Sequence, residues 1–274
     1  MAIKIWPYKQ GSKSARNLSN ELRNRLPRSN VRVLLDHQRS AWRAKPSDII
    51  INWGNSSMDN DPRMATVRSF LNAPSAVAQA SNKKTFFQGL PQAIWGSVIP
   101  FTTDRVVTQT WQEDGSKICA RTKLTGHSGD GLEVIKCQEQ LPNAPLYTKY
   151  IPKNGEWRVH FFKHGEEMVF FTQQKKRRQE VADEDVNWEV RNHDNGFIYA
   201  VNDIESIPPE APVWAAMQRS AGDLDFGAFD ILRGNSKAGG LRGHFLILEV
   251  NTACGLESPT LIDWYGQQFE RRLA

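Results

Sequence analysis

Three oxygen-bearing side chains near the C-terminal end of the chain have the types and spacing of a divalent-cation site. Glu249 and Asn251 lie two positions apart in the apolar run LILEVN, and Asp230 lies in the earlier run DFGAFDIL. Side chains two apart in a strand point to the same side, so a hairpin of these runs would bring the three together. Mg²⁺ accepts one or two carboxylates together with water and substrate phosphates. The pattern predicts a Mg²⁺ site for a nucleoside triphosphate, with solvated strand-end acids as the alternative.

A glycine-rich segment could supply a phosphate contact. It lies within RTKLTGHSGDGLEVI (121–135), between two apparent strands. Glycine allows close backbone approach and positive φ, so such a loop can lay its N–H groups over phosphates. The segment lacks the Gly-Lys-Ser/Thr ending of a P-loop and does not open a helix as a dinucleotide fingerprint does. The predicted phosphate loop comprises Gly126, His127, Ser128 and Gly129, and the alternative is a plain hairpin turn.

Cationic side chains near this loop are candidates for the same phosphates. Arg121 precedes the loop on the entering strand, and guanidinium suits bidentate phosphate contact. Lys83 and Lys84 follow a helix that Pro74 is expected to begin. The alternative is a solvated helix end whose charges complement the helix dipole.

The elements that must position these residues follow from the hydrophobic pattern. Short β-branched runs alternate with the amphipathic segment 14–26 and predict a small three-layer α/β lobe at the N-terminus. From about residue 98, short alternating runs broken by Gly, Asn or Asp predict an antiparallel sheet. A helix within 208–224, ended by Gly222, then precedes two hairpin strands joined by a glycine-rich connection at 233–243.

The bulk composition is that of a globular protein. The 274 residues are 39% hydrophobic and 24% charged, and no apolar run approaches the roughly 20 residues that cross a bilayer. Without a secretory signal pattern at the N-terminus, we expect a cytoplasmic protein with no membrane partner. Three widely spaced cysteines predict neither disulfides nor a zinc site. The net charge of +5 favours an anionic partner, nucleic acid included, but is also common for a solvated surface.

The order of these parts resembles the ATP-grasp superfamily. The resemblance rests on Asn-Lys after a helix, a cation and glycine loop, the strand PLYTKYI, the segment EWRVHFF, and LDFGAFDI with LEVNTACGLE. It covers most of residues 48–265 and is closest to the amino-acid ligase branch, which includes ribosomal-protein glutamate ligases, and to phage-encoded ATP-grasp proteins. It implies an α+β ATP-grasp fold: a small N-terminal α/β lobe (1–75) and two α+β lobes (76–150, with the glycine-rich loop, and 151–274, with the metal site) that sandwich ATP.

The resemblance also implies a role for each matching residue. Mg²⁺ ligands would be Asp230, Glu249 and Asn251; ATP-phosphate contacts would be Lys83 and Arg121; the mobile loop would be Gly126, His127, Ser128 and Gly129; the adenine hinge would be Lys149, Tyr150 and Ile151; residues beside the reacting phosphates would be Arg158, Arg191 and Asn251. Arg121 stands where most members carry lysine. Thr148-Lys149 stand where Gln-Glu is usual, so adenine preference is left open.

The activity that the resemblance implies is ATP-dependent ligation of a small-molecule or peptide carboxylate to an amine through an acyl phosphate, with release of ADP and phosphate. This chemistry needs no protein nucleophile, so Cys254 is expected to be incidental, and the histidines at 127, 160, 164 and 244 are expected to be surface or hydrogen-bonding residues. One alternative is a degenerate ATP-grasp protein that binds a host protein or nucleic acid, suggested by KKRR at 175–178. Lys176 and Arg177 would then contact an anionic partner, unless they lie in a solvated loop. A ligase that modifies nucleic acid combines both ideas.

Overall fold

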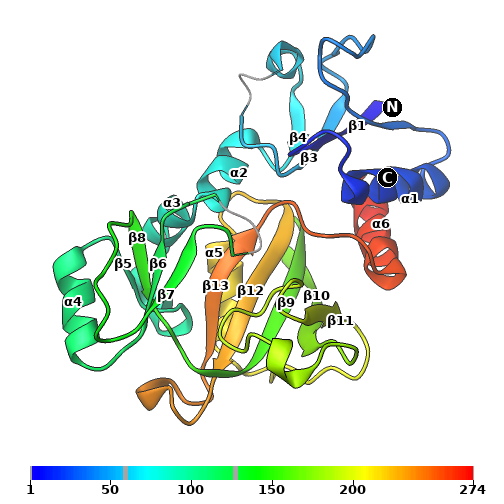
Figure 1. Ribbon diagram of the computed structural model, residues 1–274. Coiled ribbons are helices and arrows are strands. Elements are labelled where there is room, and N and C mark those ends of the chain that lie inside the picture. The colour runs from blue at the N-terminus through cyan, green and yellow to red at the C-terminus, as the bar shows by residue number, and fades with distance from the viewer. Residues whose placement is uncertain (1, 58–60, 126–128, 274) are drawn as a thin grey trace.

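The N-terminal part of the chain folds around a parallel sheet. The computed structural model describes residues 2–57, 61–125 and 129–273 (Figure 1), and the first sheet has the strand order β2-β1-β3-β4. Its elements are β1 (Ala2–Pro7), α1 (Lys13–Arg25), β2 (Asn30–Val33), β3 (Ile49–Trp53), η1 (Pro62–Ala65) and β4 (Ser69–Leu71). Leu18 and Leu22 of α1 pack with Ile3 and Ile5 on one face.

The opposite face of this sheet is covered by a 3₁₀ turn and an irregular segment, and not by an α-helix. Trp6 and Ile50 pack there with Met64 of η1 and with Trp42 of the connection between β2 and β3. The expected three-layer arrangement therefore has an irregular segment and a single 3₁₀ turn as its third layer.

The helix expected from Pro74 is divided in two. α2 (Pro74–Ser81) ends and α3 (Lys83–Gln88) begins on either side of Asn82, whose backbone is extended. The Asn82 side chain accepts hydrogen bonds from the N–H groups of Lys84 and Thr85 at 3.0 and 3.3 Å, which makes it the N-cap of α3. Lys83 and Lys84 thus follow the helix that Pro74 begins, as expected, but the alternative of a solvated helix end is wrong, because an asparagine cap starts a new helix at Lys83.

The strand-rich remainder forms two antiparallel sheets where the sequence pattern predicted one. The four-stranded sheet has the order β5-β8-β6-β7 and the five-stranded sheet has the order β11-β10-β9-β12-β13. The first contains β5 (Phe101–Thr102), β6 (Ile118–Arg121), β7 (Leu132–Ile135) and β8 (Leu146–Lys149), with α4 (Arg105–Glu113) beside it, and η2 (Gln92–Ser97) precedes β5 in the chain. The second contains β9 (Lys153–His164), β10 (Glu167–Arg177), β11 (Phe197–Ala200), β12 (Phe226–Gly234) and β13 (Phe245–Asn251). The sheets separate because β9 pairs with β10 and β12 and not with β8.

Alternation along β9 gives the five-stranded sheet two different faces, one apolar and one that is polar around Arg158 and apolar around Phe162. Trp157, Val159 and Phe161 enter the largest core, which also contains residues of α2, α3 and α5 (Val213–Ser220). The residues between them, Arg158 and His160, project to the other face. β12 and β13 form the expected hairpin, whose connection contains η4 (Gly239–Leu241).

The C-terminal helix, which the sequence analysis did not predict, returns to the N-terminal sheet. α6 (Pro259–Leu273) lies beside α1 (Figure 1). Arg25 of α1 forms ion pairs with Asp263 and Glu270 of α6, the latter at 3.0 Å. In the described ranges, no helix is both long and apolar enough to span a bilayer.

Candidate active site

Four polar side chains form a row across the five-stranded sheet, here called the polar row: Glu249, Asp230, Arg158 and Gln173. Each lies directly opposite the next in the antiparallel pairing of β13, β12, β9 and β10. Directly opposed residues of antiparallel neighbours project to the same face, so all four share the face opposite the core. Asn251, two residues beyond Glu249, lies on that face as well. The hairpin thus brings the three predicted metal ligands to one side of the sheet.

The polar row lines a large cavity. Its volume of about 1030 Å³ is at the upper end of the range for small-molecule sites. The four-stranded sheet contributes Arg121 and the segment 148–151, while the N-terminal part of the chain contributes residues such as Ser12 and Gly54. The cavity therefore lies between the two antiparallel sheets and the segments that adjoin the N-terminal sheet.

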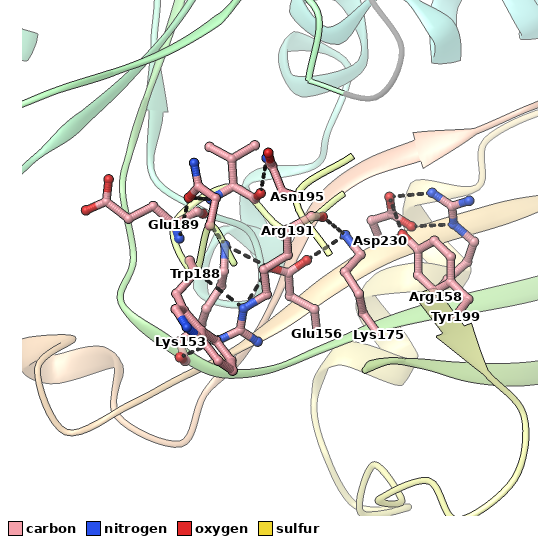
Figure 2. Close-up of polar contacts among 12 residues, drawn as sticks. Lys153, Glu156, Arg158, Lys175, Trp188, Glu189, Arg191, Asn195, Tyr199 and Asp230 are labelled. Carbon is pink, nitrogen blue, oxygen red and sulfur yellow. Dashed lines mark hydrogen bonds and ion pairs between the residues drawn. The ribbon is translucent and has the colours of Figure 1, made fainter. Parts of the chain in front are cut away.

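Arg158 and Asp230 form a bidentate ion pair in the middle of the row. The Arg158 Nε and Nη2 atoms each lie 2.7 Å from one carboxylate oxygen of Asp230, and Figure 2 shows both contacts. The guanidinium also lies 4.2 Å from the centroid of the Tyr199 ring, a cation–π distance. Burial would raise the pKa of Asp230, but the adjacent Arg158 outweighs burial and holds that pKa below its ordinary value. Asp230 is therefore ionised at neutral pH.

Glu249 faces two cations from outside its own sheet. Its Oε2 atom lies 3.5 Å from Lys83 Nζ at the start of α3 and 3.7 Å from Arg121 Nη1 on β6. The Nε atom of Arg121 is buried and has no hydrogen-bond partner among residues 2–57, 61–125 and 129–273. These two cations from the predicted phosphate site thus meet the first acid of the polar row.

Glu156, two residues before Arg158 on β9, is a second buried carboxylate of this site. Glu156 is 4% exposed, and its oxygens lie 2.7 Å from both Lys153 Nζ and Lys175 Nζ, with Arg191 Nε 4.0 Å away (Figure 2). Burial would raise the pKa of Glu156, but Lys175 and Lys153 outweigh it and hold the pKa below its ordinary value. Lys175 and Lys153 also donate to the carbonyl oxygens of Arg191 and Glu189, at 2.7 and 2.9 Å. Glu156 therefore anchors the connection between β10 and β11, including the predicted site residue Arg191, to the cavity wall.

The predicted adenine hinge joins the two antiparallel sheets. The N–H groups of Lys149 and Tyr150 donate to Pro100 O and Lys117 O at 3.0 and 2.9 Å. No described residue accepts from the N–H of Ile151, and all three hinge residues line the cavity. Of the three backbone N–H groups, that of Ile151 is the donor left for a ligand.

The predicted phosphate loop is described only at its end. Gly126, His127 and Ser128 lie outside the described residues. Gly129 lines the cavity with φ of +87°, a backbone conformation that glycine adopts readily. A Cβ atom there would come 3.5 Å from Val190, so the loop ends close to the connection that carries Arg191.

The chain is similar to known proteins in its structure and not in its sequence. No protein-family model matches the sequence, and no curated relative does either. The ATP-grasp ligase PsnB, solved with a minimal precursor, is 13% identical and matches over 97% of this chain and 98% of its own, with a TM-score of 0.61. D-alanyl-alanine synthetase A from Vibrio cholerae is 12% identical and matches over 100% of this chain and 96% of its own, with a TM-score of 0.65.

A third structure agrees with these two. The macrocyclase MdnC, bound with the precursor peptide MdnA from Microcystis aeruginosa, is 14% identical and matches over 100% of this chain and 99% of its own, with a TM-score of 0.60. The chain has the ATP-grasp fold. The predicted α+β class and architecture are confirmed, with the polar row on the sheet that carries β12 and β13.

Several cations near the ATP-grasp cavity engage the protein's own chain. The run 175–178 lies in strand β10 and its exit, so the solvated loop considered for it is wrong. Lys176 Nζ donates to Asp203 O, and Arg177 Nη2 donates to Val181 O at 2.7 Å. Each of these side chains thus donates a hydrogen bond to a backbone carbonyl oxygen of the chain itself.

The cysteine and histidine side chains considered in the sequence analysis differ in burial and in hydrogen bonding. Cys254 is 2% exposed, and burial raises the pKa of its thiol to about 11, so the thiolate is scarce at neutral pH. His164 Nε2 lies 3.0 Å from the Gln268 side-chain oxygen, and His244 is exposed. The hydrogen-bonding or surface location expected for His164 and His244 is therefore observed, and the incidental role of Cys254 stays a prediction.

His160 is the exception to a surface location, because it is fully buried in the ATP-grasp sheet. Its Nδ1 lies 3.1 Å from the Tyr265 hydroxyl and its Nε2 lies 2.8 Å from Gln173 Oε1. Burial lowers the pKa of His160 from 6.5 to about 3, so the ring stays neutral in the folded protein.

This pKa difference makes stability depend on pH. In the unfolded chain His160 binds a proton near pH 6.5, whereas in the folded chain it stays neutral until about pH 3, so stability falls as pH decreases below 6.5. From pH 8 to pH 5 we expect a loss of about 2 kcal/mol from this group. Urea denaturation of wild type and His160→Gln at both pH values measures it. The variant should lose less stability than wild type over this interval, and the exposed control His244→Gln should lose as much as wild type.

Sequence reasoning missed four residues of this site: Glu156, Gln173, Lys175 and Tyr199. Glu156 and Arg158 stand in Glu-x-Arg spacing, so strand alternation could have placed Glu156 on the same face as Arg158. The others become visible only through the register of β9, β10 and β11, which no short pattern in the sequence specifies.

Proposed function

We propose that the protein is an ATP-dependent ligase that joins a carboxylate to an amine through an acyl phosphate and releases ADP and phosphate. The observation that carries the proposal is the polar row, in which Glu249 meets Lys83 of α3 and Arg121 of β6, and Asp230 pairs with Arg158. Two neighbouring carboxylates with cations around them suit a metal-bound triphosphate, because the metal and the cations share its charge.

The donor set fits Mg²⁺. Within the described part of the chain no three His, Cys, Asp or Glu side chains converge as a metal site, so Asp230 and Glu249 need further oxygen ligands. Asn251 is assigned as one, since its amide lies on the same face as Asp230 and Glu249 and carries an oxygen acceptor. Phosphate oxygens and water would complete the set, as Mg²⁺ prefers. When bound, the ion neutralises charge on the phosphates.

The cavity offers a place for each part of ATP. The Ile151 N–H, between the two antiparallel sheets, suits an acceptor nitrogen of the base. Lys83, Arg121 and the loop 126–129 are assigned to the phosphates, and Arg158 and Arg191 to the transferred phosphoryl group. Charge-assisted contacts of this kind stabilise the charge that spreads over the phosphoryl oxygens during transfer.

The carboxylate substrate is assigned to the far side of Arg158 from the metal ligands. The neighbouring structures give the first class to test, since MdnC is bound with a precursor peptide and PsnB with a minimal precursor. In this proposal residues 1–75 form the N-terminal lobe, residues 76–150 hold the phosphate loop, and residues 151–274 hold the metal ligands. A relation to the ribosomal-protein glutamate ligases or to phage proteins stays a prediction.

Product analysis tests the proposal directly. The protein is incubated with ATP, Mg²⁺ and pooled amino acids or cell extract, and nucleotides and new amide masses are measured. Acyl phosphate chemistry yields ADP and phosphate, whereas an adenylate route yields AMP and pyrophosphate. AMP as the main product would contradict the mechanism. ATP binding without any turnover would favour the rival hypothesis, a degenerate ATP-grasp protein that binds a host protein or nucleic acid.

Removing a phosphate cation should weaken nucleotide binding. We expect Lys83→Ala and Arg121→Ala each to reduce ATP affinity by about 1 to 3 kcal/mol, the range for charge-assisted contacts. Titration calorimetry with ATP and Mg²⁺ measures the effect. Lys123→Ala is the matched control, because Lys123 is an exposed lysine whose Nζ pairs with Asp130 at 2.8 Å. Equal affinities in wild type and both site variants would remove these cations from the site.

A further inference from the structure

Positive charge is concentrated in the N-terminal part of the chain. Residues 1–75 contain 13 Lys and Arg but 5 Asp and Glu, a net charge of +8, whereas residues 76–274 contain 22 and 25, a net charge of −3. Of the described acids in residues 1–75, Asp36 alone is exposed. The net charge of +5 for the whole chain is thus the sum of a strongly basic part and a slightly acidic one.

Six exposed cations of this part follow α1 and β2 and are here called the basic ridge: Lys9, Lys13, Arg16, Arg23, Arg28 and Arg32. Three of them lie on one side of α1, because helix positions three and seven apart share a side. Arg28 lies in the turn after α1, and Arg32 lies on β2, an edge strand of its sheet. Arg23 connects the helix to this edge, since its Nε donates to Val31 O at 2.9 Å.

The fold leaves most of the ridge charges without acids. Arg25, on the side of α1 that faces α6, pairs with two acids of that helix. Among the described residues, by contrast, the six ridge cations form one ion pair, that of Lys13 with Glu257 at 3.8 Å, in which both side chains are at least 70% exposed. Like charges gathered in this way repel one another, so an anionic partner would relieve a repulsion that the folded chain itself retains.

The basic ridge begins at the opening of the cavity. Lys9 and Lys13 are exposed and also line the cavity, together with Ser12 and Ser14 at the start of α1. From Lys13 to Arg23 the helix extends about 15 Å, at 1.5 Å per residue. A polyanion bound along the ridge would therefore have part of its length at the cavity opening.

Nucleic acid is the polyanion that the ridge fits. Four of the six cations are arginines, whose planar guanidinium binds phosphate through two parallel hydrogen bonds. A stripe of Lys and Arg along a helix is the electrostatic footprint of nucleic-acid binding. Phosphate recurs at every nucleotide, so any base sequence supplies the series of charges, whereas a peptide supplies it only through a run of acidic residues.

The composition of this surface favours a base-paired duplex over a single strand. Single strands are commonly held by aromatic side chains that stack on the bases. Within residues 2–57 and 61–75, the one exposed Phe, Trp or Tyr side chain is Tyr8, at 37%. Contacts to the backbone of a duplex need cations and no stacking surface.

We propose that the basic ridge is a docking surface for a nucleic-acid duplex, DNA or RNA, which it binds through the phosphate backbone without reading the base sequence. The ridge cations are distinct from Lys83 and Arg121, which are assigned to the phosphates of ATP. Duplex binding therefore requires no nucleotide and goes beyond the proposed function.

Fluorescence anisotropy with short labelled DNA and RNA duplexes tests the proposal on the full chain without nucleotide. At physiological salt we expect a dissociation constant of about 1 to 100 μM, the range of binding that does not depend on sequence. If four arginines contact phosphate, a plot of log K against log salt between about 50 and 200 mM should have a slope of about −3 to −4. The duplex type that binds more tightly identifies the source of the backbone.

Two outcomes of this titration would overturn the proposal. One is a lack of binding to both duplexes at the lowest salt concentration. The other is tighter binding of a competitor, either a single strand of the same length or a polyglutamate peptide of the same charge. Tighter binding of the peptide would identify the ridge as a surface for acidic peptides.

Substitutions in the ridge test its location. Arg16→Gln combined with Arg23→Gln should weaken duplex binding by about tenfold or more at low salt and make the salt slope less steep by about 2, because each lost phosphate contact accounts for about 1. Arg28→Gln combined with Arg32→Gln removes the same charge from the turn and β2, with the same expected effect, and serves if the first variant does not fold.

The matched control is Arg68→Gln combined with Arg242→Gln. Both are exposed arginines outside the ridge, one before β4 at the opposite edge of the N-terminal sheet and the other in the connection between β12 and β13. Duplex affinity of the control should stay within about twofold of wild type. Equal losses in the ridge and control variants would show that net charge alone matters and would overturn the proposal. A protein that binds duplex as expected but forms no ADP from ATP would instead contradict the ligase assignment.

Discussion

Glu249→Gln is expected to reduce kcat for ADP release by at least about 10²- to 10³-fold, the loss typical when one preorganised electrostatic contact to the transition state is removed. Glutamine keeps the shape of the side chain and removes its charge. In the proposed site that charge helps to bind Mg²⁺ on the triphosphate, and the lost interaction is strongest while charge develops on the transferring group.

The fold of this variant should be nearly unchanged without ligand. Among the residues that the structure describes, the cations nearest to Glu249 are Lys83 and Arg121 at 3.5 and 3.7 Å, longer than a close hydrogen-bonded ion pair, and the Glu249 side chain is 23% exposed. Lys83 and Arg121 are as buried as the lysines beside Glu156, but Glu249 is more exposed than Glu156 and lies further from its cations, so removing its charge costs less stability. We therefore expect the melting temperature of the unliganded variant to match wild type within about 2 °C, or about 1 kcal/mol for a chain of this size.

The control for Glu249→Gln is Glu133→Gln, an exposed acid on β7. It should retain wild-type kcat and melting temperature. The two measurements together separate a catalytic role from a structural one. Wild-type turnover in Glu249→Gln would remove Glu249 from the metal site, and a low melting temperature would show that its role is structural.

The hairpin of β12 and β13, which carries the proposed metal ligands, is the part of the fold that the short-range sequence pattern predicted best. Asp230, Glu249 and Asn251 lie in apolar runs whose period of two already assigns their shared face. The only further assumption needed was that the two runs pair with each other, and a hairpin is the simplest connection between sequential strands. The apolar alternation, the side-chain types and the turn residues all indicated the same hairpin.

Other features were decided by interactions that the sequence pattern does not display. Asn82 ends one helix and caps the next, although the residues on both sides favour one continuous helix. The division into two sheets follows from β9 pairing with β12, about 70 positions later in the chain, in place of its neighbour β8. Gln173 enters the polar row through the β9–β10 register, and a shift of one residue would have placed Gln174 there instead.

Glu156→Gln should have the largest effect on stability of the substitutions considered, with a loss of about 3 to 5 kcal/mol in the free energy of unfolding at pH 7. Removing one partner of a buried ion pair leaves the other charge buried without compensation. Here two lysines lose their anion together, since Lys153 and Lys175 both lie 2.7 Å from Glu156, and their side chains are 9% and 12% exposed. Glutamine can accept one hydrogen bond from one of them, but it carries no charge for either.

The pH dependence of this contribution has a definite sign. Because the folded pKa of Glu156 lies below its ordinary value, its stabilisation is present above pH 4.5 and is lost as pH falls through the folded pKa. Urea denaturation at pH 7 should therefore show the full difference between wild type and Glu156→Gln. As the carboxyl group of the wild type is protonated in acid, the two curves should converge.

Glu189→Gln provides the comparison, because Glu189 is an acid of the same cavity region that pairs with Lys117 while 43% exposed. Exposed pairs contribute about 0 to 1 kcal/mol, so this variant should unfold close to wild type. Equal losses in the two variants would show that burial of Glu156 does not matter. If the prediction holds, Glu156 is the residue that keeps Lys153, Lys175 and the connection bearing Arg191 in place around the cavity, since it is the acid that all three approach.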